Sequence, residues 1–212
     1  MEEQAYDIIR QGGSGEIVEK KSRFIATVAP ANTEEEATAF IASMKKQYWD
    51  ARHNCSAFVV GDGQCITRCN DYGEPSGTAG RPMLDVLLNE NVRNVVVVVT
   101  RYFGGVLLGT GGLVRAYQKA TQEGLAACER MRMEYGYPIR VTTDYNGLGK
   151  IQNLLRNRDI VPEDIVYAEQ VEIQLFAPEK EKDSLVKQMT DATNGTVKIE
   201  VADGEMHGKN CG

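Results

Sequence analysis

A glycine-rich segment that directly follows a buried-strand pattern constrains the fold of this chain most strongly. Residues 95–99 are five consecutive valines, and a β-branched run of this kind is typical of a strand buried on both faces. Residues 100–117 then read TRYFGGVLLGTGGLVRAY, and apolar residues at helical spacing continue beyond them. The pattern therefore predicts a strand, a glycine-rich turn and a helix, in that order.

This glycine-rich turn has the chemistry of an anion-binding site. A helix N-terminus exposes unpaired N–H groups and carries partial positive charge, and glycine lets the backbone approach a ligand closely. Because two arginines also flank the turn, we predict that it binds a phosphate or another anion. The candidate residues are Arg101, Gly104, Gly105, Gly109, Thr110, Gly111, Gly112 and Arg115.

The segment matches neither common nucleotide-binding motif. Gly104 and Gly109 have the spacing of a Walker loop, but Thr110 occupies the position of its lysine. The dinucleotide-binding pattern fails because Gly109-Thr-Gly111 is not followed by the third glycine. Small residues also let a helix pack closely on a sheet, so a purely structural role for the glycines stays open.

A second motif precedes the first and opens another helix. Residues 71–82 read DYGEPSGTAGRP, which is rich in turn formers and predicts a loop. An apolar helix over 83–88 follows, with Pro82 at its first position. Ser76 and Thr78 are small hydroxyls that cap this helix or contact a ligand. We expect the two loops to lie side by side on one face. The candidate anion-binding residues of this loop are Ser76, Gly77, Thr78 and Arg81.

Three blocks of the chain resemble the IMPACT family, in particular its YigZ-like bacterial branch. They are RHNC at 52–55, GEPSGTAGRP at 73–82 and RYFGGVLLGTGG at 101–112, in that order. The resemblance extends in overall layout from about Gly15 to the end of the chain. It implies an N-terminal α/β domain similar to the fourth domain of elongation factor G. It also implies a C-terminal ferredoxin-like domain similar to the fifth domain of that factor.

The same resemblance implies a role in translation. Eukaryotic members resemble translation regulators that restrain a stress-activated initiation-factor kinase, and they carry an extra N-terminal interaction domain. This chain starts too close to the shared domain to hold one, so the resemblance implies a translational role without the kinase. It implies no catalytic residue.

We predict an α/β (α+β) fold with two domains. Residues 1–135 form an IMPACT-like, two-layer α/β domain. Gly136 and Pro138 break regular structure at the boundary. Residues 136–204 follow with the order βαββαβ of a ferredoxin-like plait, and residues 205–212 are expected to form a mobile tail.

Composition predicts a cytoplasmic protein that does not enter a membrane. No apolar stretch approaches the roughly 20 residues that span a bilayer, and the N-terminus lacks the pattern of a secretory signal. Five cysteines without framework spacing indicate reduced thiols. The net charge of −6 disfavours indiscriminate nucleic-acid binding. Residues 52–120, with seven basic and five acidic side chains, are however net positive, so they can form a local basic surface.

The cysteines and His53 offer two kinds of chemistry, zinc binding and nucleophilic catalysis. His53, Cys55, Cys65 and Cys69 are possible zinc ligands, but their spacing is not convincingly paired and buried free cysteine is common. A Cys55 nucleophile assisted by His53 is less favoured, because residues two apart on a strand share a face without guaranteed contact. We therefore predict no metal and no cofactor.

Three carboxylates near the second motif are candidates for acid or metal-ligand roles: Asp71, Glu74 and Asp85. We favour turn formation and helix capping for them, and assign no catalytic residue. Ferredoxin-like sheets often bind RNA through exposed aromatic side chains. The candidates here are Phe176 and Tyr167, which we expect to find in the core instead.

The function predicted from the sequence is a non-enzymatic regulator or accessory factor of translation. Its partner is RNA, the ribosome or a translation-associated protein, bound at the glycine-rich surface. One alternative is an enzyme acting on a small phosphorylated or carboxylated ligand in the same cleft. Another is an adaptor that binds protein alone, with purely structural glycines. The sequence does not predict the oligomeric state.

Overall fold

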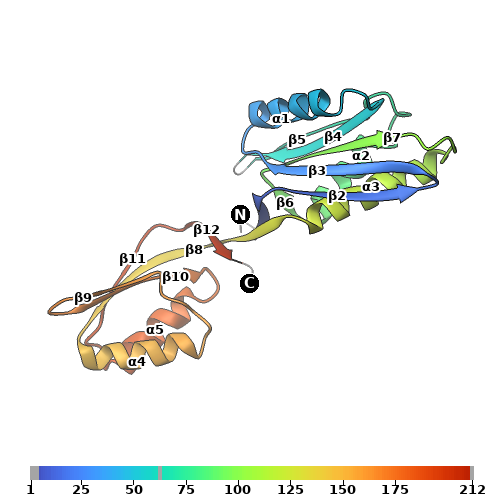
Figure 1. The fold of residues 1–212 in the computed structure, drawn as a ribbon. Helices are drawn as coiled ribbons and strands as arrows, with labels where there is room; N and C mark the ends of the chain where they lie inside the picture. The colour runs from blue at the N-terminus through green and yellow to red at the C-terminus, as the bar shows by residue number, and fades with distance from the viewer. Residues whose placement is uncertain (1–4, 62–63, 211–212) are drawn as a thin grey trace. The chain divides into compact units, whose positions relative to one another are not determined.

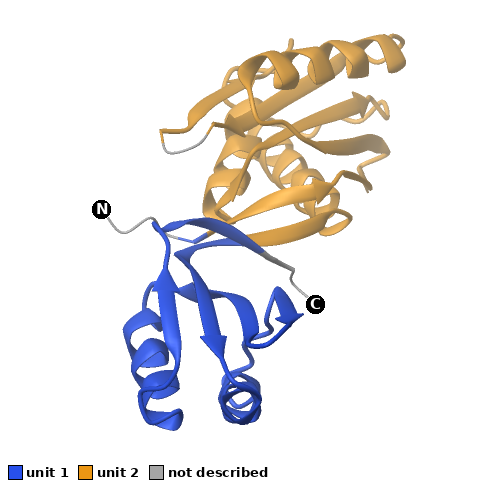
Figure 2. Cartoon of the chain, turned by 90° about the vertical axis from the view of Figure 1, so that its left-hand side faces the viewer, with its two compact units in different colours: residues 1–5, 133–209 blue, residues 6–132, 210–212 orange. Residues whose placement is uncertain are grey.

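The computed structural model describes residues 5–61 and 64–210, and the chain divides into two compact units (Figure 2). The N-terminal unit comprises residues 6–132 and the C-terminal unit residues 133–209. Each unit has its own cluster of buried apolar residues. Both units mix helices and strands, which confirms the predicted fold class. No helix in the described part of the chain is long and apolar enough to cross a membrane.

The N-terminal unit is built on a five-stranded antiparallel sheet. Its order is β2-β3-β7-β4-β5. The strands are β2 (Gly13–Glu19), β3 (Ser22–Pro30), β7 (Val95–Tyr102), β4 (His53–Val60) and β5 (Ile66–Asn70). The five valines begin β7, the central strand, and all are buried. The prediction of a strand covered on both faces is therefore confirmed.

Helices cover both faces of this sheet (Figure 1). Helices α2 (Gly80–Asn89) and α3 (Thr110–Ala126) pack on the face that includes Val97, whereas α1 (Glu34–Gln47) packs on the face that includes Val96. We predicted two layers, and the structure corrects this to three. The reason is that side chains alternate along a strand, so a continuous valine run needs an apolar partner on each face.

A small parallel pair completes the N-terminal unit. Strand β1 (Tyr6–Gln11) pairs with β6 (Val92–Arg93) and lies next to the start of β8 (Glu129–Thr143). Two ion pairs join these segments within the unit. Arg132 donates to Asp7 at 2.8 Å, and Arg130 donates to Glu90 at 2.6 Å.

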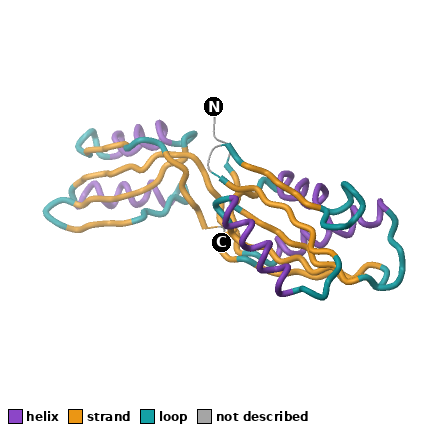
Figure 3. The backbone as a smooth tube through the Cα atoms, turned by 90° about the horizontal axis from the view of Figure 1, so that it is seen from above, coloured by secondary structure: helices purple, strands orange, loops and turns teal. Residues whose placement is uncertain are grey.

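The C-terminal unit is the predicted ferredoxin-like plait. Its sheet order is β9-β10-β8-β11, antiparallel throughout. The remaining elements are α4 (Tyr145–Arg156), β9 (Asp164–Tyr167), β10 (Val171–Pro178), α5 (Lys182–Ala192) and β11 (Lys198–Val201). The helices run nearly parallel to the strands (Figure 3) and share one core with them, so the opposite face of the sheet is left uncovered by helices.

Two details differ from the sequence prediction. Gly136 and Pro138 lie inside β8 instead of ending regular structure. Pairing overrides their breaking tendency, because β10 lies opposite both residues and the carbonyl oxygen of Pro138 accepts a hydrogen bond from Ala202 N. The predicted mobile tail begins as strand β12 (Glu205–Asn210), which pairs with β8, while residues 211–212 lie outside the described part.

Candidate functional site

All three sequence blocks meet at one hollow of about 390 Å³ in the N-terminal unit. The start of β4, the loop before α2, the end of β7 and the loop into α3 each contribute to its wall. The lining residues are Arg52, His53, Gly73, Glu74, Pro75, Arg101, Phe103, Leu107, Leu108, Gly109, Thr110 and Leu113. We call this the block hollow. The two glycine-rich loops thus lie beside each other, with the short block at 52–55 next to them.

A buried ion pair forms the floor of the block hollow. Arg101 Nη1 donates to Glu74 Oε1 at 2.7 Å, and the two side chains are only 6% and 3% exposed. Tyr117 Oη donates to the same oxygen at 2.8 Å. The guanidinium also lies 5.3 Å from the ring centroid of Phe24. Both hydrogen bonds go to Oε1, and Oε2 accepts no hydrogen bond from the described residues.

This arrangement changes the role of Arg101. The charge that we predicted to face an anion is neutralised by a carboxylate and removed from solvent. Breaking the pair would leave one ion uncompensated in a low-dielectric interior, which is strongly unfavourable. An anion-binding role for Arg101 therefore stays a prediction, and the first effect of its removal is expected on stability.

Cys55 belongs to the same buried network. Its Sγ lies 2.9 Å from the carbonyl oxygen of Asp71 and 3.3 Å from Tyr117 Oη. Burial raises the pKa of the Cys55 thiol to about 12, against a smaller opposing effect of the hydrogen bond with Tyr117. The thiol is therefore protonated at neutral pH and is a poor nucleophile. Burial likewise raises the pKa of Tyr117, which stays a neutral donor.

The other suggested metal ligands have separate partners. His53 Nδ1 lies 3.2 Å from the carbonyl oxygen of Tyr72, and Cys65 Sγ lies 3.5 Å from that of Gly61. Among residues 5–61 and 64–210, no group of three or more His, Cys, Asp or Glu side chains is arranged to hold a metal ion. The absence of zinc remains a prediction for elemental analysis of the purified protein.

Asp71 shapes the second glycine-rich loop by capping α2. Its Oδ1 accepts hydrogen bonds from Ala79 N at 3.0 Å and Gly80 N at 2.8 Å, and its Oδ2 accepts from Gly77 N at 2.8 Å. Burial raises the pKa of Asp71, but the three N–H donors together outweigh burial and lower it overall. The capping role that we favoured for Asp71 is confirmed.

The hydroxyl groups predicted as caps of α2 have other roles. Thr78 is buried and donates to the carbonyl oxygen of Pro75 at 2.6 Å, whereas Ser76 is exposed. The helix also starts at Gly80, two residues earlier than predicted, so Pro82 is its third residue. Proline is tolerated there because the first four N–H groups of a helix lack intrahelical partners.

Neither of the two remaining predicted arginines lines the block hollow. Arg81 pairs with Asp85 at 2.7 Å on the surface of α2. Arg115 is exposed and lines a separate hollow of about 520 Å³ between α2 and α3, beside Lys119. The structure therefore does not bring Arg101 and Arg115 into one site. Arg115 lies five positions after Thr110, and this spacing turns the two side chains to different sides of α3.

Backbone geometry explains two of the glycines. A Cβ at Gly104 would overlap the carbonyl group of Lys21, and Gly104 N donates to Ser22 Oγ at 3.1 Å. Gly109 precedes α3 with φ of +71°, and no side chain caps the helix there. Gly104 thus has a packing role, whereas Gly109 leaves the first N–H groups of α3 without a side-chain partner. Gly105, Gly111 and Gly112 complete this loop and first turn.

Exposed aromatic and apolar side chains that the sequence did not single out surround the block hollow. We call them the rim: Tyr72, Phe103 and Leu107, which are 41%, 50% and 82% exposed. Phe103 and Leu107 line the hollow, and the carbonyl oxygen of Tyr72 lies 3.2 Å from Nδ1 of His53, which lines it too. The signal in the sequence was the position of Phe103 and Leu107 inside the glycine-rich block, but their exposure depends on tertiary contacts.

Basic side chains accompany the rim. Lys45 lies 4.0 Å above the ring of Tyr72, and the backbone of Lys21 contacts Gly104. Within the described residues, no ion pair is formed by the exposed cations Lys21 or Arg52. We call these two the rim cations, since Arg52 lines the hollow and Lys21 contacts the loop into α3. The predicted Arg81 and Arg101, in contrast, are paired with carboxylates.

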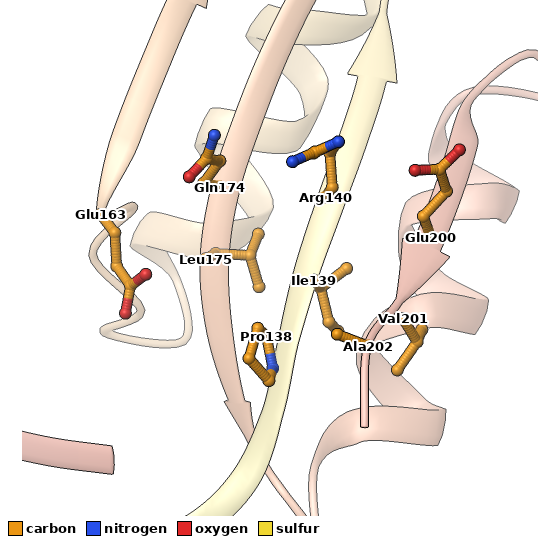
Figure 4. Close-up of a pocket in the computed structure, with 9 residues that line it drawn as sticks. All are labelled: Pro138, Ile139, Arg140, Glu163, Gln174, Leu175, Glu200, Val201 and Ala202. Carbon is orange, nitrogen blue, oxygen red and sulfur yellow. The ribbon is translucent and has the colours of Figure 1, made fainter. Parts of the chain in front are cut away.

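The C-terminal unit has a hollow of a different character on the uncovered face of its sheet (Figure 4). Its volume is about 380 Å³, and Glu163 and Glu200 flank Arg140, which itself pairs with Glu172 at 3.1 Å. Two carboxylates beside one paired arginine do not suit a phosphate backbone.

The two candidate aromatic residues, Phe176 and Tyr167, are not in the core of this sheet, contrary to our expectation. Phe176 is half-buried and stacks on His207 with ring centroids 4.4 Å apart, and His207 in turn lies 2.9 Å from Glu163. Tyr167 is 59% exposed on the edge strand β9. Successive side chains of a strand point to opposite faces of the sheet. Because Ile173 and Leu175 face the helices and belong to the core, Phe176 faces the other side.

Fold and site together define a class of protein: a two-unit α/β protein in which three separate blocks build one hollow with a charged, buried floor. A model of the Impact N-terminal domain matches residues 20–125, and a model described as a domain of unknown function (DUF1949) matches residues 141–196. The chain belongs to the IMPACT family.

Relatives of known sequence or structure match at least 66% of this chain. The chain is 45% identical over 205 residues to IMPACT family member YvyE of Bacillus subtilis, covering 95% of this chain and 92% of that protein. It is 41% identical over 142 residues to IMPACT family member YigZ of Escherichia coli, covering 66% and 70%. A solved structure described as a hypothetical protein matches with a TM-score of 0.58 at 32% identity, covering 96% of this chain and 98% of that one.

Proposed function

We propose that this protein is a non-enzymatic regulator or accessory factor of translation that acts in the cytoplasm. Its partner is RNA of the translation machinery, bound at the rim of the block hollow. The observation that carries the proposal is the grouping of exposed aromatic side chains with unpaired cations around this one hollow. The family resemblance to translation regulators supports it.

The chemistry of the rim suits a nucleic-acid strand. Proteins that bind single strands combine cations, which track the backbone, with aromatic rings, on which bases stack. Tyr72 and Phe103 provide such rings, and the rim cations provide the charge. Thr110 and the open first turn of α3 add hydrogen-bond donors for a phosphate. The acidic net charge of the chain then limits binding to this surface.

A salt titration of RNA binding tests the proposal. The full-length protein should bind RNA with an affinity that falls as salt rises, and each lost phosphate contact should reduce the slope of log K against log salt by about 0.7 to 1. Lys21→Ala and Arg52→Ala should each show this reduction. Lys187→Ala is the matched control, because Lys187 is exposed on α5 of the other unit.

Two outcomes would overturn the proposal. One is the absence of salt-sensitive RNA binding by the wild-type protein. The other is equal retention of the same lysate proteins before and after nuclease treatment, which would instead identify an adaptor that binds protein alone.

An enzyme acting on a small phosphorylated or carboxylated ligand is the second candidate, because the size of the block hollow suits a small molecule. Its available carboxylate, Glu74, is however paired with Arg101, and the nearby thiol of Cys55 is protonated. Thermal stabilisation by a small phosphorylated compound, lost in Phe103→Ala and absent with RNA, would favour the enzyme.

A further inference from the structure

We propose that the block hollow receives one unpaired guanine base of an RNA strand, with Phe103 against the base and Glu74 as the acceptor for its edge. This inference rests on the proposed function and names the part of the RNA that the site selects. Three properties of the hollow carry it: its volume and walls, the chemistry of its floor, and the position of the cations outside it.

Volume and walls suit a flat apolar group. The hollow holds about 390 Å³, within the range of about 300 to 1,000 Å³ that small-molecule sites span. Phe103, Leu107 and Pro75 form apolar parts of its wall, and Phe103 is half exposed. A nucleobase has apolar faces that stack on such a ring, whatever its sequence context.

The floor excludes phosphate and selects a hydrogen-bond donor. Glu74 has both of its hydrogen bonds on Oε1, from Arg101 and Tyr117, so Oε2 remains as an acceptor. An ionised carboxylate only accepts hydrogen bonds, and a phosphodiester group has no donor to offer it. Phosphate therefore belongs outside the hollow, and the group inside must present N–H groups toward Glu74.

Guanine meets this requirement best among the four bases. Its Watson–Crick edge presents two adjacent donors, the ring N1–H and the exocyclic N2 amino group. Guanine also carries the acceptor O6 on this edge, but adenine, cytosine and uracil each have only one donor group there, so none of them offers the carboxylate two adjacent donors. Since these groups are used in base pairing, the guanine must be unpaired to reach Glu74.

The cations lie where the strand would continue. Lys21 contacts the loop that carries Phe103, and Arg52 lines the hollow itself. Tyr72 is 41% exposed and directly precedes Gly73, which lines the hollow. A strand that inserts one base thus finds charge for its flanking phosphates and a second ring for a neighbouring base. These contacts favour RNA over a free guanine nucleotide.

Modified RNA tests the inference with unaltered protein. Fluorescence anisotropy would compare a short oligouridine with one central guanosine against the same strand with N1-methylguanosine or uridine at that position. We expect binding to weaken roughly tenfold or more when the donors are lost, and similarly when a complementary strand pairs the guanosine. Guanosine monophosphate is the competitor that represents a free nucleotide, and it should compete far more weakly than the RNA.

Protein variants provide the matching test. Phe103→Ala should weaken binding roughly tenfold and remove the preference for guanosine. Val106→Ala is the control, because Val106 is exposed in the same loop but does not line the hollow. If circular dichroism shows that Glu74→Gln is folded, this variant should have lost the preference for guanosine. If Glu74→Gln is unfolded, the result of Phe103→Ala decides.

The outcomes separate this inference from the proposed function. RNA binding could be sensitive to salt and yet have the same affinity without guanosine, with methylated guanosine and in Phe103→Ala. This result would overturn the base-binding role and leave the proposed role in translation unaffected. Competition by guanosine monophosphate as strong as by RNA would overturn the choice of RNA. No RNA binding at all would overturn both.

Discussion

Burial decides what a charged residue can do in this protein. Arg52 and Arg101 each begin one of the three sequence blocks, yet Arg101 is 6% exposed and paired, while Arg52 is exposed and unpaired among the described residues. The desolvation of Glu74 and Arg101 is offset by their mutual contact and by hydrogen bonds from Tyr117 and to Ser22. A charged side chain near a glycine-rich loop is therefore not sufficient evidence that this residue binds an anion.

Removing one member of the buried pair should be severe. We expect Glu74→Ala to lower the free energy of unfolding by about 3–5 kcal/mol, because Arg101 is left charged and buried. The double variant Glu74→Leu/Arg101→Met should recover much of this loss. Urea unfolding measures both. Glu16→Ala, which breaks the exposed pair with Arg23, is the control and should move the midpoint far less. A small effect of Glu74→Ala would contradict the buried pair.

At the scale of elements, loops in this protein are shaped by contacts from distant positions. The cap of α2 comes from Asp71, nine residues before Gly80 in the chain. The loop into α3 is held against the β2–β3 turn at Gly104 and Ser22. Each glycine-rich loop therefore has its own anchor, and the block hollow lies between the two.

The cap of α2 predicts a pH-dependent effect. Asp71→Ala should lower the free energy of unfolding by about 1–2 kcal/mol at neutral pH. Because the pKa of Asp71 is lowered in the folded protein, its contribution is present above its ordinary pKa of 3.8 and is lost as the pH falls through the lower folded value. Wild type and variant should therefore converge in acid. Ser76→Ala, at the cap position suggested by sequence, should have little effect; equal losses would refute capping by Asp71.

The glycine anchor of the loop into α3 makes a second prediction at this scale. Gly104→Ala should destabilise the protein by roughly 1–3 kcal/mol, because its Cβ would overlap backbone atoms of Lys21. Gly149→Ala is the comparison: Gly149 lies in α4 with open space around it, so alanine should stabilise by up to about 1 kcal/mol. Thermal unfolding measures both. An unchanged Gly104→Ala variant would show that this loop can move away from the β2–β3 turn.

For the whole molecule, the two separate cores predict two unfolding units. Leu87 belongs to the N-terminal core and Leu185 to the C-terminal core, and both are 0% exposed. Each substitution to alanine should cost about 2–5 kcal/mol and lower only one of two calorimetric transitions. A single transition lowered equally by both variants would mean that the units unfold together. The predicted domain division stays a prediction until this is measured.

The chain order of the elements was predictable because its signals are local. The valine run of β7, the turn formers of the two glycine-rich loops and the alternation in β10 each act within a few residues. The ferredoxin-like order follows from such signals in sequence. Residues that usually break regular structure are weaker evidence, since pairing with β10 keeps Gly136 and Pro138 inside β8.

The sequence by itself determined which segments become strands, helices and glycine-rich loops, and it marked the three blocks that meet at the hollow. Only the tertiary structure decided that Arg101 pairs with Glu74, 27 residues away, and that Arg115 faces a different hollow. It also left Phe103 half exposed at the wall of the block hollow. The physical reason is that backbone preference is set by near neighbours, whereas the partner of a side chain is set by which distant segments pack together.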